Sequence, residues 1–466
     1  MRYVSTRGEA APRSFEAVLL AGLAEDGGLF LPETWPTLTP AEWEALRGLP
    51  YPDLAADIIG RFTGDTFAPG VLLAMCREAY AGFTTPAVCP LVQLDERRFA
   101  LELFHGPTLA FKDFALQLLG RMFDHVLARR GERITIVGAT SGDTGSAAIE
   151  ACRDRAQLDI VILHPEGRTS PVQRRQMTTV HSPNVRNIAV HGDFDTCQDL
   201  VKAMFNDAPF RAEMNLSAVN SINWARIAAQ IPYYVASALA LGAPQREVAF
   251  SVPTGNFGNV FAAWAARSMG LPISTLIIGA NRNDILARFI GANDMTARPV
   301  APSLSPSMDI QVSSNFERLL FELLGRDGAK TAATMRAFRE TGAMPVPDAA
   351  WRAATALFRA HAVSDEETVA EMRRLHDQGY AADPHTAAGT AASHHSPPDD
   401  ARTPIIVAAT AHPAKFPDAV EQATGARPAL PPHMADLYER EERFTVVPND
   451  LATIEAAVRA HARRNV

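Results

Sequence analysis

Cysteine is scarce in this sequence, and no two cysteines stand close together. The four lie far apart and form no CxxC pair; they are Cys76, Cys89, Cys152 and Cys197. This spacing argues against a disulfide framework and against a zinc site of the finger type. A reducing compartment fits such a chain, and we expect a cytoplasmic protein.

Signals for export and for membrane insertion are also lacking. The first residues, MRYVSTRGEAAPRSFEAV, contain no apolar stretch like that of a secretory signal. Two uncharged runs, 227–245 and 248–266, approach the roughly 20 residues that span a bilayer. Residues such as Pro232 and Asn256 interrupt them and would leave polar groups unsatisfied in lipid. We interpret both runs as buried segments and expect no membrane association.

An excess of positive charge is missing as well. The chain has 44 Lys and Arg against 52 Asp and Glu, which gives a formal net charge of -8. Neither nucleic acid nor an acidic membrane surface is therefore expected as the main partner. Apolar residues at 47% and charged residues at 21% are typical of a globular protein. A length of 466 residues exceeds one compact core and predicts two or three domains.

The sequence does contain apolar runs that alternate with amphipathic stretches. RITIVGA precedes SAAIEACRDRA and LDIVILHPEG, and EVAFSVP precedes VFAAWAARSMG and ISTLIIGA. This alternation predicts βαβ units and parallel sheets, and therefore an α/β fold. The small, polar and proline-containing stretch 387–404 is predicted to be an exposed loop.

Changes in this pattern suggest where the domains begin and end. Residues 1–95 are predicted to form a mainly helical N-terminal domain, in which Ser14 caps a helix that ends at Gly27 and Gly28. Residues 96–215 would form a smaller α/β domain, and residues 216–466 a larger one.

One lysine stands in an unusual setting, the segment LFHGPTLAFKDFALQLLG. Lys112 is surrounded by apolar and aromatic residues just before a helical pattern. Desolvation lowers the pKa of an ammonium and gives the neutral amine that Schiff-base chemistry with an aldehyde cofactor requires. The alternative is a structural lysine whose stem packs on Phe111 and Phe114 while its ammonium pairs with Asp113. Taken alone, the segment favours the structural alternative.

Two glycine-rich turns each follow an apolar run and precede a helical pattern. They are GATSGDTGSAA and SVPTGNFGNVFAAW. Small residues let the backbone approach a ligand, and a helix N-terminus offers free N–H groups and a positive dipole end. Both turns are candidate anion sites, although neither has the Walker A pattern or the dinucleotide fingerprint. The first is also compatible with an ordinary turn capped by Ser141, Asp143 or Thr144.

Five motifs, taken in order, resemble those of threonine synthases of the longer bacterial and fungal type. They are HGPTLAFKDF, ATSGDTGSAA, NSINWARI, SVPTGNFGN and ATAHPAKF, and DGGLFLP and HGDFDTCQDLV extend the likeness over nearly the whole chain. The resemblance implies a fold-type-II, tryptophan synthase β-like architecture with two α/β domains. It also implies pyridoxal 5'-phosphate as cofactor. The implied reaction converts O-phospho-L-homoserine and water to L-threonine and phosphate by β,γ-elimination and replacement, the last step of threonine biosynthesis.

The resemblance further implies a set of cofactor-binding residues. They are Lys112, Asp143, Gly255, Asn256, Phe257, Gly258, Asn259 and Thr410. Lys112 would be the catalytic residue that forms the Schiff base and moves protons, and Thr410 would donate to the pyridine nitrogen. Asp143 stands where related enzymes have an Asn beside the ring hydroxyl. An ionised Asp only accepts hydrogen bonds, so it would need a protonated ring oxygen or a proton of its own.

A second implied set would bind the substrate. Ser141, Gly142 and Thr144 would hold its carboxylate, and Asn220, Ser221 and Arg226 its phosphate. An arginine fork suits a phosphate, whereas the alternative for Arg226 is a surface position on an amphipathic helix. His385 and Lys415 are weaker candidates that are compatible with structural roles.

Other classes of function remain open from the sequence. A related phospho-lyase would release phosphate, an oxo acid and ammonia without adding water, and a non-catalytic relative would only bind an amino acid. We expect a monomer or a homodimer. No metal is expected, because His394 and His395 are adjacent in the predicted loop and no Cys or third His lies nearby in the sequence.

Overall fold

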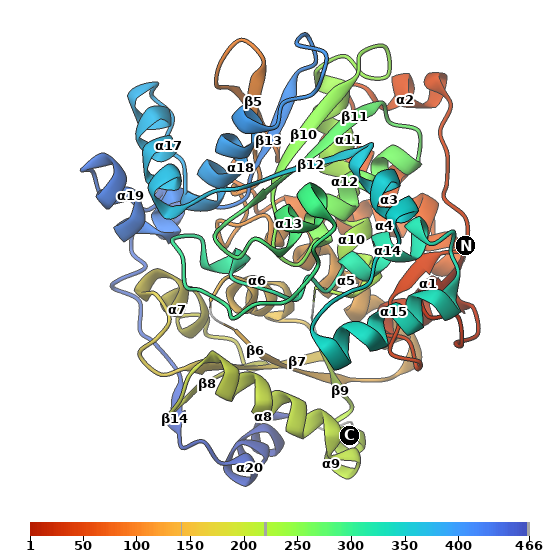
Figure 1. The fold of residues 1–466 in the computed structure, drawn as a ribbon. Coiled ribbons are helices and arrows are strands. Elements are labelled where there is room, and N and C mark those ends of the chain that lie inside the picture. Colours follow the sequence, from red (N-terminus) through yellow and green to blue (C-terminus); the bar gives the residue numbers. More distant parts are fainter. Residues whose placement is uncertain (141, 219–220, 464–466) are drawn as a thin grey trace. The chain divides into compact units, whose positions relative to one another are not determined.

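The structure, a computed structural model, describes residues 1–140, 142–218 and 221–463 (Figure 1). The chain forms two compact units. The first unit comprises Met1–Arg77, Phe83–His105 and Ser221–Pro428, and the second comprises Glu78–Gly82, Gly106–Asn220 and Ala429–Val466. The three-domain division with borders at residues 95 and 215 stays a prediction.

A six-stranded sheet forms the centre of the first unit (Figure 1). Its strand order is β12-β11-β10-β13-β5-β4, and every neighbouring pair is parallel except β4 and β5. The strands are β4 (Leu91–Gln93), β5 (Arg98–Glu102), β10 (Val248–Pro253), β11 (Ile273–Ala280), β12 (Phe358–Ala362) and β13 (Ile405–Ala409). Parallel strands are buried on both faces, and β10 and β13 are buried along their whole length.

Helices cover both faces of this sheet. Ser251 of β10 donates a hydrogen bond to the carbonyl of Gly389 in α18, whereas the neighbouring Phe250 contacts Tyr234 of α11. The helices of the first unit as a whole are α1 (Phe15–Ala21), α2 (Pro40–Leu46), α3 (Tyr51–Thr63), α4 (Pro69–Tyr80), α10 (Trp224–Ala228), α11 (Ile231–Ala240), α12 (Gly258–Ser268), α13 (Ile285–Ala292), α14 (Phe316–Leu323), α15 (Gly328–Thr341), α16 (Asp348–Thr355), α17 (Asp365–Asp377), α18 (Pro384–His395) and α19 (Pro417–Thr424). The last residues of α4 belong to the second unit.

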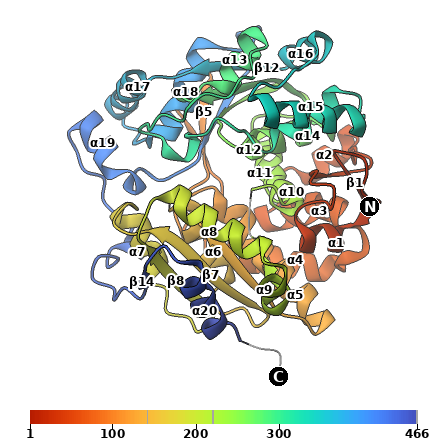
Figure 2. The ribbon, with the colours of Figure 1, turned by 60° about the horizontal axis from the view of Figure 1, so that its bottom comes forward.

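A parallel sheet also forms the centre of the second unit (Figure 2). Its order is β14-β8-β7-β6-β9, with β6 (Ile134–Ala139), β7 (Leu158–Pro165), β8 (Val185–Val190), β9 (Leu216–Ser217) and β14 (Thr445–Val447). The helices are α5 (Lys112–Arg130), α6 (Asp143–Cys152), α7 (Pro171–Thr178), α8 (Phe194–Asn206), α9 (Ala208–Met214) and α20 (Leu451–His461). The α/β fold with parallel sheets is confirmed.

Each sheet has a point at which the strand order reverses. In the first unit the chain proceeds outward from β10 through β11 to β12, and β13 then returns to the other side of β10. In the second unit it proceeds from β6 through β7 to β8, and β9 lies on the other side of β6. Ligands of open α/β sheets bind beyond the carboxyl ends of strands at such reversal points. Both predicted glycine-rich turns follow a strand at a reversal point, namely β6 and β10.

The N-terminal region contains a small antiparallel sheet in addition to helices. Its order is β2-β1-β3, with β1 (Arg2–Ser5), β2 (Arg13–Ser14) and β3 (Phe30–Pro32). Ser14 caps α1 as predicted, since its side chain accepts a hydrogen bond from the N–H of Ala17 at 3.3 Å. The predicted helix end at Gly27 and Gly28 is wrong, because α1 already stops at Gly22, where φ is +68°.

The predicted exposed loop over 387–404 is wrong in its first half. These residues continue α18, in which Ala387, Ala388 and Ala392 are fully buried. A Cβ atom at Gly389 would lie 3.0 Å from Cδ of Pro253 in β10, so the small side chains permit close packing of helix and sheet. Within the described residues, no helix is both long and apolar enough to cross a membrane.

Candidate active site

Lys112 is the first residue of α5, and it forms an ion pair with the first residue of α6. Its Nζ atom lies 3.3 Å from Oδ2 of Asp143, and the two side chains are 11% and 7% exposed. Nζ also lies 5.1 Å from the centre of the Phe111 ring. A helix N-terminus carries a partial positive charge and disfavours an ammonium. The carboxylate of Asp143 offsets that charge.

Asp113, the alternative partner that the sequence suggested for Lys112, binds elsewhere. Its carboxylate accepts hydrogen bonds from the N–H and the hydroxyl of Thr108, at 2.8 and 2.6 Å. Asp113 is fully buried, and a Cβ atom at Gly106 would lie 2.5 Å from its Oδ2. Asp113 therefore fixes the turn that precedes α5, while the ion pair of Lys112 is formed with Asp143.

Gln173 of α7 orients the carboxylate of Asp143. Its Nε2 donates to Oδ1 of Asp143 at 2.9 Å, and its Oε1 accepts from the hydroxyl of Ser170 at 2.9 Å. A Cβ atom at Gly142, whose φ is +148°, would lie 2.5 Å from the Gln173 side chain. Sequence reasoning missed Gln173, because a single Gln inside a polar helix has no distinctive pattern.

A residue that the sequence did not single out, Thr140, stabilises the turn between β6 and α6. Thr140 accepts hydrogen bonds at Oγ1 from the N–H groups of Gly142 and Gly145, both at 2.9 Å. Ser141, a predicted cap and carboxylate ligand, lies outside the described residues. Gly142 and Thr144, the other two predicted carboxylate ligands, lie at the start of α6, where the first N–H groups of a helix lack partners within the helix. Two N–H groups of this turn, those of Gly142 and Gly145, are thus already bonded within the turn.

The second glycine-rich turn, Gly255–Asn259, has a strained backbone and little free space. Phe257 has φ +65° and is the N-cap of α12. Its ring is buried and contacts the rings of Phe316 and Phe358, at centroid distances of 5.5 and 5.7 Å. Residues at positive φ other than glycine are uncommon and cluster at functional sites. A Cβ atom at Gly255 would lie only 3.1 Å from Cα of Met308, so a larger residue would push against that backbone.

Hydrogen bonds to two carbonyl groups and one side chain hold this turn in place. The carbonyl of Gly255 accepts from the hydroxyl of Ser313 at 2.7 Å, and that of Asn256 accepts from Nδ2 of Asn315 at 2.9 Å. Asn259 accepts at Oδ1 from the hydroxyls of Tyr233 and Tyr234, at 2.5 and 2.7 Å.

The amide nitrogen of the Asn259 side chain is a candidate donor to a ligand. Its Nδ2 is buried and has no hydrogen-bond partner within the described part of the chain. A buried amide donor without a partner is costly. Together with the first N–H groups of α12, it makes a site that fits a phosphate.

Arg226 of α10 is a buried cation. The side chain is 5% exposed, and its Nε and Nη1 atoms have no hydrogen-bond partner among the residues that the structure describes. Burial lowers the pKa of its guanidinium to about 10. The alternative of a surface position is therefore wrong. A buried charge without a partner is strongly unfavourable, which makes Arg226 a candidate anion ligand.

Of the remaining predicted ligands, the structure describes Ser221 and Thr410, and both belong to the first unit. Ser221 is half-buried, and its carbonyl accepts from Nδ2 of Asn315 at 3.2 Å. Asn220 lies outside the described residues. Thr410 directly follows β13 and is buried.

Both ring nitrogens of His385 have partners in the described fold. Its Nδ1 lies 2.7 Å from Oδ2 of Asp383, and its Nε2 accepts from the N–H of Ser307 at 3.2 Å. This pattern assigns the proton to Nδ1. Lys415, in the short helix Pro413–Lys415, is fully buried.

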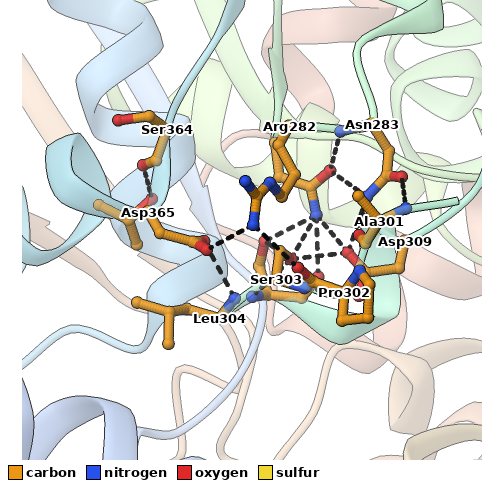
Figure 3. A network of polar contacts seen from close by, with 12 residues as sticks. Arg282, Asn283, Ala301, Pro302, Ser303, Leu304, Asp309, Ser364 and Asp365 are labelled. Carbon is orange, nitrogen blue, oxygen red and sulfur yellow. Dashed lines mark hydrogen bonds and ion pairs between the residues drawn. The ribbon is translucent and has the colours of Figure 1, made fainter.

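A polar network fixes the segment that carries Ser307 and Met308 (Figure 3). Asn281 directly follows β11, and its Nδ2 donates to Oδ1 of Asp309 and to the hydroxyl of Ser303, both at 2.7 Å. Asp365 accepts from the N–H of Leu304 at 3.1 Å. The network holds residues 301–309 against the end of β11 and the start of α17, and with them the backbone that approaches Gly255.

Comparison with known protein families agrees with this geometry. A family described as "Threonine synthase N terminus" matches residues 2–80, one described as "Pyridoxal-phosphate dependent enzyme" matches residues 88–342, and one described as "Threonine synthase, C-terminal" matches residues 386–458. The three matches together span most of the chain.

Individual relatives are similar over their full length. The chain is 56% identical over 468 residues to the threonine synthase of Pseudomonas aeruginosa, covering 100% of this chain and 99% of that protein. The pyridoxal-phosphate-bound structure of threonine synthase from Brucella melitensis superposes with a TM-score of 0.98 at 52% identity, over 100% of both chains. The Escherichia coli threonine synthase structure gives 0.82 at 31% identity, covering 99% of this chain and 100% of that one.

Proposed function

Because this chain belongs to the threonine synthase family of pyridoxal-phosphate-dependent enzymes, we propose that it converts O-phospho-L-homoserine and water to L-threonine and phosphate. Its activity is that of a threonine synthase, a lyase that uses pyridoxal phosphate. The proposal concerns the substrate and the roles of individual residues. The observation that carries it is the buried guanidinium of Arg226, whose Nε and Nη1 lack a partner among the described residues and fit the phosphate of such a substrate.

The residues fit the cofactor on two observations. Lys112 supplies a largely buried amine. Asn259 supplies a buried Nδ2 donor beside the first turn of α12, and we assign the cofactor phosphate to this turn together with Gly255 and Gly258. When bound, pyridoxal phosphate supplies an aldehyde that links to an amine and a ring that withdraws electrons from the carbon beside it. Thr410, at the end of β13, is proposed to donate to the ring nitrogen.

We assign the proton transfers to Nζ of Lys112. In this proposal the amine removes a proton from Cα and one from Cβ of the substrate, and returns protons to Cγ and Cα. Phosphate leaves from Cγ, and water adds at Cβ as a hydroxyl group. The other proton of that water leaves with the phosphate. The carboxylate of Asp143 accepts hydrogen bonds from Lys112 and Gln173. Its proposed role is therefore to hold Nζ in place as the lysine gains and loses a proton.

The substrate carries two anionic groups, and the chain offers a site for each. We assign the phosphate to Arg226 with Ser221 and Asn220, because a guanidinium forks around phosphate oxygens. The carboxylate is assigned to the turn that opens α6, through Ser141, Gly142 and Thr144. A helix N-terminus favours a carboxylate through its partial positive charge, although the N–H of Gly142 itself donates to Thr140.

The reaction is tested by following both products at once. O-phospho-L-homoserine is incubated with the yellow holoenzyme, which absorbs at about 410 nm when the cofactor is linked to a lysine. Equal yields of phosphate and L-threonine are expected. Phosphate with 2-oxobutyrate and no threonine would instead identify a phospho-lyase. A colourless protein after incubation with pyridoxal phosphate would identify a relative that does not hold the cofactor.

A further inference from the structure

Two histidines and one glutamate, none of them assigned a role above, meet on the surface of the first unit. His361 lies in β12, Glu367 in the first turn of α17, and His395 is the last residue of α18 (Figure 1). One ligand atom from each lies within 4.8 Å of the others. These three residues, the His361–Glu367–His395 cluster, come from separate elements that the sequence gives no reason to combine.

We propose that this cluster binds a divalent transition-metal ion of the Zn²⁺ class. Nε2 of His361 lies 3.3 Å from Oε1 of Glu367, and Nε2 of His395 lies 3.7 Å from the same oxygen. An ion with bonds of about 2.1 Å to nitrogen and oxygen holds tetrahedral ligands roughly 3.4 Å apart. The two distances bracket that separation. Two imidazoles with one carboxylate are borderline ligands that favour Zn²⁺, Cu²⁺ or Ni²⁺ over Mg²⁺ and Ca²⁺.

A hydrogen bond to its second oxygen fixes the carboxylate of Glu367. Its second oxygen, Oε2, accepts from the N–H of Ser364 at 2.8 Å as part of a capping box at the start of α17. That hydrogen bond lowers the pKa of Glu367, so the group is an anion at neutral pH. Hydrogen-bonded support of this kind orients a metal ligand. Oε1 therefore stays directed at the two imidazoles.

The local charge also suits a cation. His395 ends α18, and the C-terminus of a helix carries a partial negative charge. The neighbouring arginines have carboxylates of their own: Arg359 lies 2.5 Å from Asp399, and Arg282 lies 3.5 Å from Asp365. With neutral imidazoles the cluster carries one negative charge, so a bound M²⁺ ion would give the site a net charge of only +1.

One adjustment is required before an ion can bind. The rings of His361 and His395 are stacked, with centroids 4.0 Å apart and planes 14° apart. An ion lies in the plane of each imidazole that binds it, so at least one ring must tilt. His395 can do so, since its side chain is 51% exposed at a helix end. Bound metal would then link β12, α17 and α18.

The test is a Zn²⁺ titration of the holoenzyme without an affinity tag, in competition with a fluorescent zinc chelator. We expect one equivalent bound, and affinity at least about tenfold weaker in His361→Gln, Glu367→Gln and His395→Ala. Glu367→Gln retains the capping box, because Gln also serves at that position. The matched control is His376→Ala, an exposed histidine of α17 outside the cluster. It should bind as the wild type does.

A second readout reports the ligands directly. Cu²⁺ bound to the wild type should show two imidazole nitrogens in its electron paramagnetic resonance spectrum, and His395→Ala should show one fewer. Threonine formation by each variant verifies that it is folded. The proposal is overturned if no equivalent of Zn²⁺ binds with a Kd below about 100 µM. Affinity equal to the wild type in all three ligand variants would overturn it as well.

Discussion

Lys112 and Asp143 open two helices, and their side chains meet at 3.3 Å between Nζ and Oδ2. The N-termini of α5 and α6 both carry a partial positive charge. The carboxylate of Asp143 thus lies beside these two helix ends and beside the ammonium of Lys112. The ion pair is almost fully buried, and breaking a buried pair by removing one partner leaves an uncompensated charge. The partner of Lys112 in the structure is thus Asp143, whereas the structural alternative drawn from the sequence paired the lysine with Asp113.

Replacement of Lys112 tests its proposed role in proton transfer. In Lys112→Ala the turnover of O-phospho-L-homoserine should fall by at least about a thousandfold, because a positioned general base contributes that much. The measurement is the rate of phosphate and threonine release. Lys202→Ala, at a 66% exposed lysine of the same unit, is the control and should retain wild-type rates. Full turnover by Lys112→Ala would refute the assignment.

Gln173 is expected to act on catalysis only through Asp143. Gln173→Ala removes the 2.9 Å hydrogen bond to Oδ1, and we expect kcat to fall by about tenfold. Gln173→Glu should be worse, because it places a second carboxylate beside the first. Gln176→Ala is the matched control on the same helix, where Nε2 donates to the carbonyl of Thr108 at 3.1 Å. A larger loss of kcat in that control than in Gln173→Ala would contradict the prediction.

Arg226→Met should weaken substrate binding and stabilise the substrate-free holoenzyme. We expect KM to rise by at least about tenfold, since the guanidinium fork is lost. Removal of the buried charge should raise the free energy of unfolding by about 1–3 kcal/mol. Thermal unfolding with and without inorganic phosphate measures the second effect. Phosphate should stabilise the wild type and leave the variant unchanged; an equal response in both would argue against Arg226 as the phosphate ligand.

The pH dependence of the Arg226 effect follows from the direction of its pKa shift. Burial lowers the pKa from the ordinary, higher value of a guanidinium to about 10 in the folded state. Below about 10 the group is charged in both states and the burial cost, on the order of 3 kcal/mol, is fully present. Between the two values the folded protein loses the proton first. The destabilisation is therefore relieved only as the pH rises through that window, and at neutral pH an anion must offset it.

Gly255→Ala should reduce affinity for the cofactor. The added Cβ would lie 3.1 Å from Cα of Met308 and from the carbonyl oxygen of Ser307, which are both backbone atoms and must move. We expect about a tenfold rise in the Kd for pyridoxal phosphate, measured by absorbance titration of the apoenzyme. Gly291→Ala in α13 is the control, because nothing lies within 4 Å of its added Cβ. Unchanged affinity in Gly255→Ala would show that the turn accommodates the methyl group.

The sequence was sufficient to place the two glycine-rich turns. The apolar runs before SGDTG and GNFGN are long, and each ends in small residues, so the pattern predicts a strand and then a helix start. The structure places both turns at strand-order reversals. Ser14 was also recognisable as a cap, because it directly precedes an apolar helical stretch.

Features that depend on contacts distant in the sequence could not be predicted in this way. Gln173 acquires its meaning from a carboxylate 30 residues away, and the burial of Arg226 depends on how α10 packs. The loop prediction at 387–404 failed because Ala, Gly, Ser and Thr are typical both of linkers and of helices that pack closely on a sheet. Likewise, His395 was judged without His361, which precedes it by 34 positions and stacks on it in the fold.

The tight packing of α18 has a consequence for how substitutions in this protein are interpreted. Its middle residues are assigned no ligand, yet Ser251 and Pro253 of the strand that leads into the GNFGN turn lie directly against them. Any larger side chain at Gly389 would push on that strand and displace the turn beyond it. A mutational survey would therefore score 387–392 as intolerant as the active site itself. Such intolerance would reflect the close packing of α18 on β10 and should not be taken as evidence that these residues take part in catalysis.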